Sequence, residues 1–201
     1  MAGKGQGGIA RLAAAGLLLT LLGGCINIGS SKAPGSLIRL TPAEGSAAGL
    51  SATAKAGEAL VVFEPQTDRS LGVTRVPVQV NDSTLAYLAG ANWVDRPARL
   101  MRALLAETIR GRGKRLVFED DQGEVRGNLR LTGRLSAMGY DARSRSVVVR
   151  FDAMLQMADG AMASRRFEAV RAGVAPKAKS IAPALNAAAN EVAGQVADWV
   201  K

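Results

Sequence analysis

Hydrophobic residues recur along this chain with two spacings, and each spacing predicts a different kind of element. Alternation at every second residue, typical of strands with one buried face, occurs in segments 74–80, 128–137, 146–157 and 163–171. Spacing of three and four residues, typical of amphipathic helices, occurs in segments 97–110 and 180–200. A compact apolar run at 59–63, ended by Pro65, predicts a fully buried strand.

Shorter pieces complete this outline. Extended structure is also predicted for 37–40 as an edge strand, for 83–88 and for 115–118. Pro77 cannot donate a backbone hydrogen bond, which indicates that its strand lies at an edge or contains a bulge. Residues 41–58 are rich in alanine, glycine and serine without sustained periodicity, so we interpret them as a loop.

The first helix carries recognisable signals at both ends. Asp95 is the expected N-cap, Pro97 suits the first turn, and Gly111 fits the stop. Its apolar stripe is formed by Leu100, Met101, Leu104, Leu105 and Thr108 or Ile109. The charged residues of this helix are expected to face away from that stripe, namely Arg99, Arg102, Glu107 and Arg110.

The order of elements predicts the fold class. The hairpin signal Asp159-Gly160 and the short connections predict an antiparallel meander for the last three strands. The final helix has Pro183 in its first turn and an apolar stripe formed by Ile181, Leu185, Ala188, Val192, Val196 and Trp199. Strands, helix, strands and helix predict an α+β fold, with a mostly antiparallel sheet and two helices packed on one face.

A different pattern precedes these elements. Lys4 and Arg11 supply positive charge, and residues 12–22 form an uncharged apolar run. As a helix this run would rise about 16 Å, about half of the ~30 Å needed to cross a bilayer core. We therefore interpret it as the hydrophobic region of a signal peptide rather than as a membrane anchor.

The apolar run ends in Leu22-Gly23-Gly24-Cys25, which resembles the lipobox of bacterial lipoproteins. In that interpretation cleavage falls between Gly24 and Cys25, and Cys25 carries a diacylglycerol and an N-acyl group, enough acyl chains for stable anchoring. The alternative is an ordinary secretory peptide with an incidental cysteine. The lipobox divides the chain into a signal peptide (1–24), a lipidated tether (25–36) and one domain (37–201).

Ile26 bears on the membrane in which the protein resides. In lipoproteins, aspartate directly after the cysteine retains the protein in the inner membrane. Ile26 stands at that position here. The sequence therefore favours the periplasmic face of the outer membrane.

Composition narrows the range of functions. The formal net charge of +9 falls to +7 when Lys4 and Arg11 leave with the signal peptide. An exported lipoprotein rarely meets nucleic acid, so we interpret the charge as facing anionic lipid or an acidic partner. An arginine-rich surface without a specific partner explains it equally well.

The residue types for common catalytic sites are missing or scattered. The chain has no histidine, which excludes a Ser-His-Asp triad and most zinc sites. We interpret the carboxylates at Glu119, Asp120, Asp121 and Glu124 as an exposed hairpin turn rather than a cation site or an acid–base pair. We therefore predict that the protein is not an enzyme and holds no metal ion or cofactor other than its covalent lipid.

Two scarce aromatic residues are candidates for contact with lipid or a partner, Tyr87 and Trp93. Trp93, directly before the first helix, is better explained by packing onto the first turns of that helix. Trp199 is interpreted in the same way, as part of the core.

Several of these features together resemble the ABC-type transport auxiliary lipoproteins, which include the Pqi-type outer-membrane lipoprotein and the auxiliary lipoproteins of Mce-type lipid transporters. The resemblance rests on the lipobox, on Arg75-Val-Pro-Val-Gln-Val80, on Leu85-Ala-Tyr87 with Asn92-Trp-Val-Asp-Arg96, on Arg165-Arg-Phe-Glu-Ala169 and on Asp198-Trp-Val200. Residues 41–58 depart from it, since they are longer and blander than the corresponding link in the family.

The resemblance implies a non-catalytic role in transport of lipid between the inner and outer membranes. It implies an Mce-domain protein, an ABC permease and an ATPase as partners, with membrane lipid and without nucleic acid. A homo-oligomer stays open, as do two other classes of function. One is a structural lipoprotein that assists assembly of an outer-membrane complex, as pilotins and lipopolysaccharide-assembly lipoproteins do. The other is a periplasmic hydrolase.

Overall fold

A computed structural model describes residues 36–55, 57–113, 115–120 and 127–200 of the chain. Gly24, Cys25 and the predicted tether up to residue 35 lie outside the described residues, as do Asp121 and Glu124. The elements in chain order are β1 (Leu37–Ile38), β2 (Gly57–Val62), β3 (Arg75–Gln79), β4 (Leu85–Trp93), α2 (Pro97–Arg112), β5 (Val117–Glu119), β6 (Gly127–Asp141), β7 (Ser146–Gln156), β8 (Met162–Arg171) and α3 (Ala178–Trp199).

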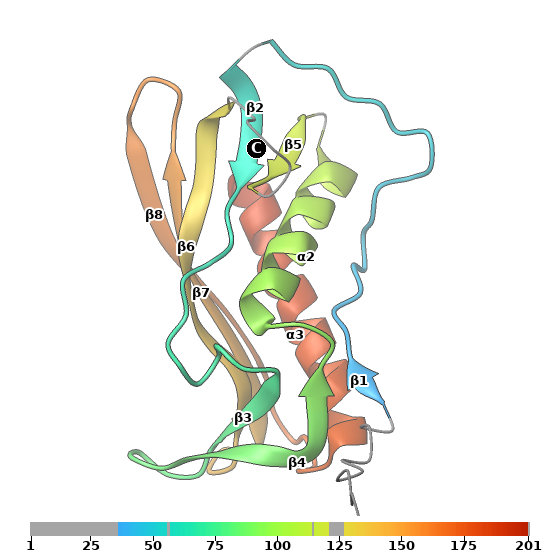
Figure 1. Ribbon diagram of the computed structural model, residues 1–201, viewed down its shortest axis with the longest axis vertical. Helices are drawn as coiled ribbons and strands as arrows, with labels where there is room; N and C mark the ends of the chain where they lie inside the picture. The colour runs from blue at the N-terminus through green and yellow to red at the C-terminus, as the bar shows by residue number, and fades with distance from the viewer. Residues whose placement is uncertain (1–35, 56, 114, 121–126, 201) are drawn as a thin grey trace, which may run out of the picture. The chain divides into compact units, whose positions relative to one another are not determined.

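Strand β6 is shared by two parts of the sheet (Figure 1). Along one edge this 15-residue strand pairs antiparallel with β7 from Arg130 to Asp141, and β7 pairs antiparallel with β8. Along the other edge the start of β6 pairs with β2, Leu129 opposite Leu60, and its end pairs with β3, Tyr140 opposite Val78. Because β5 flanks β2 while β4 and β1 continue from β3, β6 joins all eight strands into one sheet.

The prediction of a mostly antiparallel sheet was wrong, because the sheet is mixed. Four pairings are parallel, β1–β4, β2–β5, β2–β6 and β3–β6, against three antiparallel ones. Alternation along a strand specifies which face is buried but says nothing about which neighbour the strand takes. The meander of β6, β7 and β8 is confirmed, since short turns fix those pairings locally.

The parallel pairings also overturn the predicted hairpin turn around Glu119 and Asp120. Strands β5 and β6 do not pair with each other, because both run parallel to β2 on its two sides. The last residue of β5 and the first residue of β6 therefore lie on opposite sides of β2. Such a connection has no local sequence signal comparable to a hairpin turn.

Strand β3 shows how Pro77 is accommodated away from an edge. This strand lies between β4 and β6, and its register shifts between Arg75 and Pro77, so the bulge interpretation is confirmed and the edge interpretation is wrong. Opposite Pro77 lies Gly139 of β6, where an added Cβ would come within 2.4 Å of the Pro77 carbonyl oxygen. Glycine at 139 therefore permits the close approach of these two strands.

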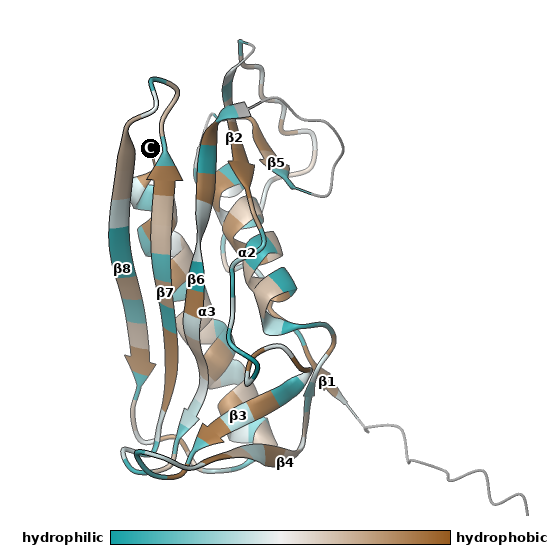
Figure 2. Cartoon of the chain, turned by 60° about the vertical axis from the view of Figure 1, so that its left-hand side comes forward, coloured by the Kyte–Doolittle hydropathy of each residue, from teal (hydrophilic) through white to brown (hydrophobic). Residues whose placement is uncertain are grey.

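Both helices cover the same face of the sheet, behind the strands in the view of Figure 2. The inward residues of β7 are buried as the alternation predicts, and so is Phe167 of β8, which meets Trp199 edge-on at 5.6 Å between ring centroids. The stripe of α3 is buried at Ile181, Leu185, Ala188, Val192 and Val196. None of the helices among the described residues is both long and apolar enough to cross a membrane.

The ends of α2 differ from the prediction by one or two residues. The N-cap is Arg96 rather than Asp95, and it makes no side-chain capping hydrogen bond; Asp95 instead accepts hydrogen bonds from the Arg96 amide and the Arg99 guanidinium. Gly111 lies inside the helix, which ends at Arg112 with Gly113 as its C-cap. Capping signals thus place this helix well but do not fix its last residue.

The predicted loop before β2 is attached to both helices. The Thr41 and Ala43 amides donate to the side-chain oxygens of Asn186 and Asn190 on α3, at 2.8 and 2.6 Å. The Ser46 amide donates to Glu107 of α2 at 2.6 Å, which is the largest cause of the lowered pKa of that carboxyl. The composition of residues 41–58 gave no sign of these hydrogen bonds, which fix the segment through its backbone.

Arg102 was expected to face solvent, and this expectation was wrong. Its side chain is only 6% exposed and forms ion pairs with Glu119 at 3.2 Å and with Asp120. Arg110, further along α2, also forms an ion pair with Glu119 at 3.4 Å. These contacts fasten α2 to β5, so an arginine on the helix is buried because the neighbouring strand supplies its counter-charges.

Arg102→Met should therefore destabilise the fold much more than Arg99→Met, the same substitution on the same helix. Removing Arg102 takes a buried positive charge away from the Glu119 and Asp120 carboxylates, whose side chains are 15% and 25% exposed, and we expect a loss of about 2–3 kcal/mol in free energy of unfolding. The Arg99–Asp95 pair is exposed, at 49% and 37%, so its loss should cost less than about 0.5 kcal/mol. Urea denaturation measures both; equal losses would contradict a structural role for the Arg102 pairs.

The turn between β6 and β7 is closed by Asp141. Its carboxylate accepts hydrogen bonds from the Arg143 amide at 2.9 Å and from the Arg143 guanidinium at 2.7 Å. These contacts, the guanidinium first, lower the pKa of Asp141 to about 2. A depressed pKa means that the ionised carboxylate stabilises the folded state.

Asp141→Asn should lower stability by about 1 kcal/mol at neutral pH, because asparagine keeps the shape but not the charge. In the wild type this contribution is fully present above the unfolded pKa near 4 and is lost as pH falls towards 2. The difference between the urea midpoints of the two proteins should therefore shrink between about pH 5 and pH 2. A difference that is independent of pH would assign the effect to packing instead of charge.

Candidate functional site

The two aromatic candidates have different surroundings. Trp93 is 1% exposed and belongs to the core, so it packs inside the protein rather than presenting a surface to lipid or a partner. Tyr87 is half-buried, and its hydroxyl donates a hydrogen bond to the Ser70 carbonyl at 3.3 Å. The Arg75 guanidinium lies over its ring, with Cζ 4.0 Å from the ring centroid. Of the pair, only Tyr87 can contribute to an outer surface.

The two candidate acidic residues that the structure describes, Glu119 and Asp120, serve the fold. Glu119 and Asp120 are occupied by the Arg102 and Arg110 pairs, and Asp120 also accepts a hydrogen bond from the Glu64 amide at 3.1 Å. Across the part of the chain that the structure describes, no three carboxylate or cysteine side chains cluster as metal ligands would.

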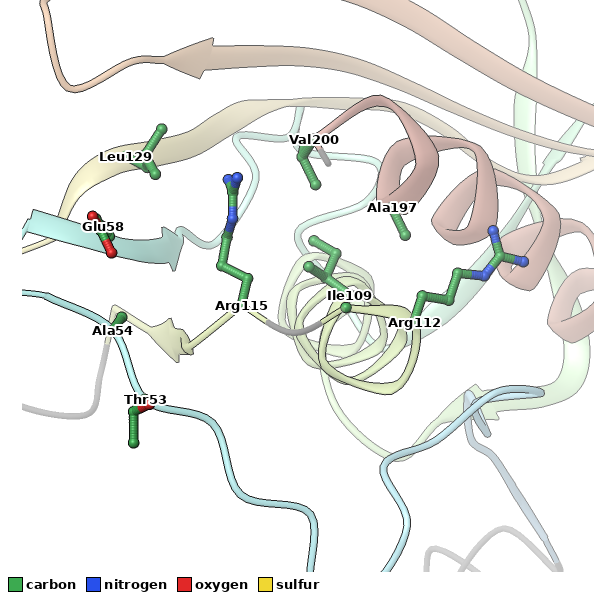
Figure 3. A pocket seen from close by; sticks show the side chains of 10 residues that line it. Thr53, Ala54, Glu58, Ile109, Arg112, Arg115, Leu129, Ala197 and Val200 are labelled. Atoms are coloured by element: carbon green, nitrogen blue, oxygen red, sulfur yellow. The ribbon is translucent and has the colours of Figure 1, made fainter.

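A pocket of about 550 Å³ lies where α2 and α3 end, beside the starts of β2 and β6 (Figure 3). This volume falls in the range of small-molecule sites. We call this end of the domain the pocket end. The residues that line the pocket are Thr53, Ala54, Glu58, Ile109, Arg112, Gly113, Arg115, Leu129, Ala197 and Val200.

Aliphatic side chains form the floor of the pocket. Ile109 of α2 is 4% exposed, while Ala197 and Val200, at the end of α3, are each 2% exposed. Leu129 closes the side formed by β6. These residues belong to the same apolar core that holds the helices on the sheet, so the pocket opens directly onto that core.

Arg112 forms one wall and is fixed by its partners. Its guanidinium pairs with Glu44 and with Asp198 at 2.9 Å, and donates to the Gly194 carbonyl at 2.8 Å. The hydrogen bond to Glu44 is the largest cause of the raised pKa of Arg112. Because Glu44 comes from the loop, Asp198 from α3 and Arg112 from α2, this arginine holds three segments at the rim of the pocket.

Arg115 differs from Arg112 in having no ion pair with any carboxylate that the structure describes. Its side chain extends from the link between α2 and β5 towards Leu129 and Val200, above the apolar floor (Figure 3). Glu58 lies across the opening, on β2. A positive charge over an apolar floor suits a ligand group with an apolar body and an anionic end.

Sequence reasoning did not identify any residue of this pocket as part of a binding site, although it placed Ile109 in the apolar stripe of the first helix. A signal was present, because residues 110–115 contain Arg110, Arg112, Lys114 and Arg115 around two glycines, at the end of a helix. Such a cluster at a helix C-terminus is easily explained by the helix dipole alone. It becomes the wall of a pocket only because the end of α3 and the start of β6, which are far away in sequence, lie against it.

Comparison with known sequences gives one family match. The family model for the ABC-type transport auxiliary lipoprotein component matches residues 40–197. This match extends from the loop before β2 to the end of α3 and so includes most of the pocket. No curated protein matches the chain at a significant level.

Two crystal structures have the same fold. Protein XCC0632 from Xanthomonas campestris, described by the family model DUF330, superposes with a TM-score of 0.70 at 18% identity, covering 82% of this chain and 94% of that one. An uncharacterized protein superposes with a TM-score of 0.62 at 14% identity, covering 72% of this chain and 93% of that one. At these identities the likeness supports the fold alone.

The pocket should bind a small amphipathic anion more tightly than a neutral molecule of similar shape. Anilinonaphthalene sulfonate and neutral phenyl-naphthylamine provide such a pair of fluorescent probes. Arg115→Gln should weaken binding of the sulfonate about tenfold, because it removes a charge-assisted hydrogen bond, and should leave the neutral dye nearly unaffected. Lys55→Gln, an exposed cation that does not line the pocket, is the control; equal losses in both variants would contradict a role for Arg115.

Proposed function

This chain belongs to the ABC-type transport auxiliary lipoprotein family, and on that basis we propose that it is a non-catalytic, membrane-anchored subunit of a system that moves lipid between the inner and outer membranes. The observation that carries the proposal is the family match over residues 40–197, which covers nearly the whole predicted domain.

The proposed anchor is the lipid on Cys25. The signal peptide (1–24) directs export, cleavage after Gly24 exposes Cys25, and the tether (25–36) connects the acylated cysteine to the domain. Together, the acyl chains hold the protein stably on a membrane, which one chain alone would not do. With Ile26 after the cysteine, the proposed location is the periplasmic face of the outer membrane.

The proposed partners are an Mce-domain protein and, through it, an ABC permease and an ATPase. In this arrangement the lipoprotein contributes binding rather than chemistry, which agrees with a pocket lined by aliphatic side chains and two arginines. The pocket end lies at the C-terminus of α3, and residue 36 joins the opposite end of the domain near the N-terminus of that helix. We assign the pocket end to contact with the partner because the tether holds the other end near the membrane.

Removing the lipid should release the protein without unfolding it. The mature chain with Cys25→Ala, exported behind a cleavable signal peptide of the non-lipoprotein type, should be recovered in the soluble periplasmic fraction with an unchanged urea midpoint. The wild-type chain behind its own signal peptide should stay with the membranes. Membrane retention of the cleaved Cys25→Ala chain would contradict anchoring through Cys25.

Crosslinking of the wild-type protein in cells, followed by mass spectrometry, completes this experiment. An Mce-domain protein recovered with its permease or ATPase is the expected result. Arg115→Glu at the pocket end should reduce that crosslink while leaving the membrane fraction unchanged. Recovery of a secretin or an outer-membrane barrel instead would refute the transport proposal and favour an assembly factor.

A further inference from the structure

The end of the domain opposite the pocket is formed by four segments that are far apart in the sequence. They are the chain start (36–39), the β3–β4 turn (80–84), the β6–β7 turn with the last residue of β6 (141–145), and the link from β8 into the first turn of α3 (172–179). We call this surface the tether end. Arg143 pairs with Asp82 across two of the turns, and the Val174 amide donates to the Arg145 carbonyl at 2.9 Å. Leu37 and Arg39 line a hollow of about 450 Å³ together with Lys179 at the start of α3.

The charge on the tether end is unbalanced. Arg39, Arg145, Lys177 and Lys179 are exposed there, and none forms an ion pair with a carboxylate in the part of the chain described. The two carboxylates of these turns, Asp82 and Asp141, are both paired with Arg143. Helix α3 adds the positive end of its dipole at this surface. No acidic residue in its first turn offsets that charge, and its N-cap is Lys177.

Aliphatic side chains accompany these cations. Three exposed aliphatic residues belong to or adjoin the tether end. Leu37 is 50% exposed, Val80 42% and Leu85 41%. Exposed aliphatic residues beside lysine and arginine are typical of surfaces that rest in the interfacial region of a bilayer. At the pocket end, Arg112 is paired with Glu44 and Asp198, and Arg115 is the lining arginine without an ion pair to a described carboxylate.

The length of the tether limits where this surface can be. Ser36 follows Cys25 by 11 residues, which span at most about 38 Å when fully extended and about 18 Å as a flexible coil. A protein anchored at Cys25 therefore keeps the tether end within reach of the bilayer at all times. Strand β7, with 11 residues, places the β7–β8 turn about 34 Å further away.

We propose that the tether end is a membrane-contact surface that lies against anionic lipid headgroups, so that the domain stands on the bilayer with its pocket end directed away from it. This proposal rests on the proposed anchor for its biological setting. The partner of this surface is an anionic bilayer. Three observations favour it: the cations without ion pairs, the exposed aliphatic side chains, and the tether, which joins the domain at the same surface.

The test uses the whole mature chain with Cys25→Ala, which removes the lipid and leaves only the surface. Sedimentation at low ionic strength with vesicles of phosphatidylethanolamine and phosphatidylglycerol should show binding that salt abolishes, and phosphatidylcholine vesicles should show none. Combined Lys177→Gln and Lys179→Gln should weaken binding about thirtyfold, since each basic residue near an anionic surface contributes about fivefold.

A matched double variant separates the surface from net charge. Lys55→Gln with Arg134→Gln removes two exposed, unpaired cations that lie outside the tether end, and it should change binding less than threefold. Equal weakening by the two double variants would overturn the proposal, because binding would then follow total charge. Absence of binding to anionic vesicles by the unsubstituted Cys25→Ala chain would also overturn it.

Orientation is measured with one fluorescent label at a time. The chain has a single cysteine, so Cys25→Ala leaves none, and Ala142→Cys or Ala158→Cys then provides a unique site in an exposed turn at either end of β7. An environment-sensitive dye at position 142 should shift to the blue with anionic vesicles, and the same dye at 158 should not. A shift at 158 equal to that at 142 would refute the orientation.

This experiment and the test of the anchor fail independently. Lipidation of Cys25 is tested by fractionation of cells, whereas the surface is tested with purified chains that carry no lipid. Loss of vesicle binding with normal anchoring would reject only the membrane-contact surface. Vesicle binding by a protein that is never lipidated in cells would reject only the anchor.

Discussion

The fold depends on one strand that takes three partners. Strand β6 has 15 residues and pairs with β7 along most of one edge, but β2 and β3 divide the other edge between them. A shorter strand would lose its pairing with either β2 or β3, and the strands beyond that one would be separated from the rest of the sheet with it. Backbone groups in a buried sheet need their hydrogen bonds, so the length of β6 determines how many strands the sheet can hold. The close approach of Pro77 to Gly139 is needed because it lets β3 pair with the end of β6.

The elements of this fold could be predicted from sequence much better than their partners. Period-two and period-three-to-four patterns located the meander and both helices, because those patterns report which residues face the core. Direction and neighbour are set by contacts between distant segments, such as Leu60 with Leu129, and no local pattern records them. The buried state of Arg102 was missed for the same reason, since its counter-charges are on β5 and not on its own helix.

The candidate site was less predictable than the fold. Lipidation of Cys25 rests on a short linear motif, which a sequence displays in full, and it stays a prediction because it lies outside the described residues. The pocket, by contrast, combines Thr53, Arg112, Leu129 and Val200, four residues that only tertiary structure brings together. Trp93 shows what sequence can decide: its place directly before a helix favoured packing over a functional contact, and its side chain is indeed buried.

The direction in which β6 and β7 run also has a mechanical consequence. The tether joins the domain at one end of these strands, and the surface assigned to the partner lies towards the other. A pull between membrane and partner would therefore act along the strands, at right angles to the hydrogen bonds between them. In that shear geometry the hydrogen bonds of the β6–β7 ladder share the load and must yield together, whereas a pull across the strands would open them one after another. In the proposed arrangement, tension between the membrane and the partner would therefore be carried along the strands.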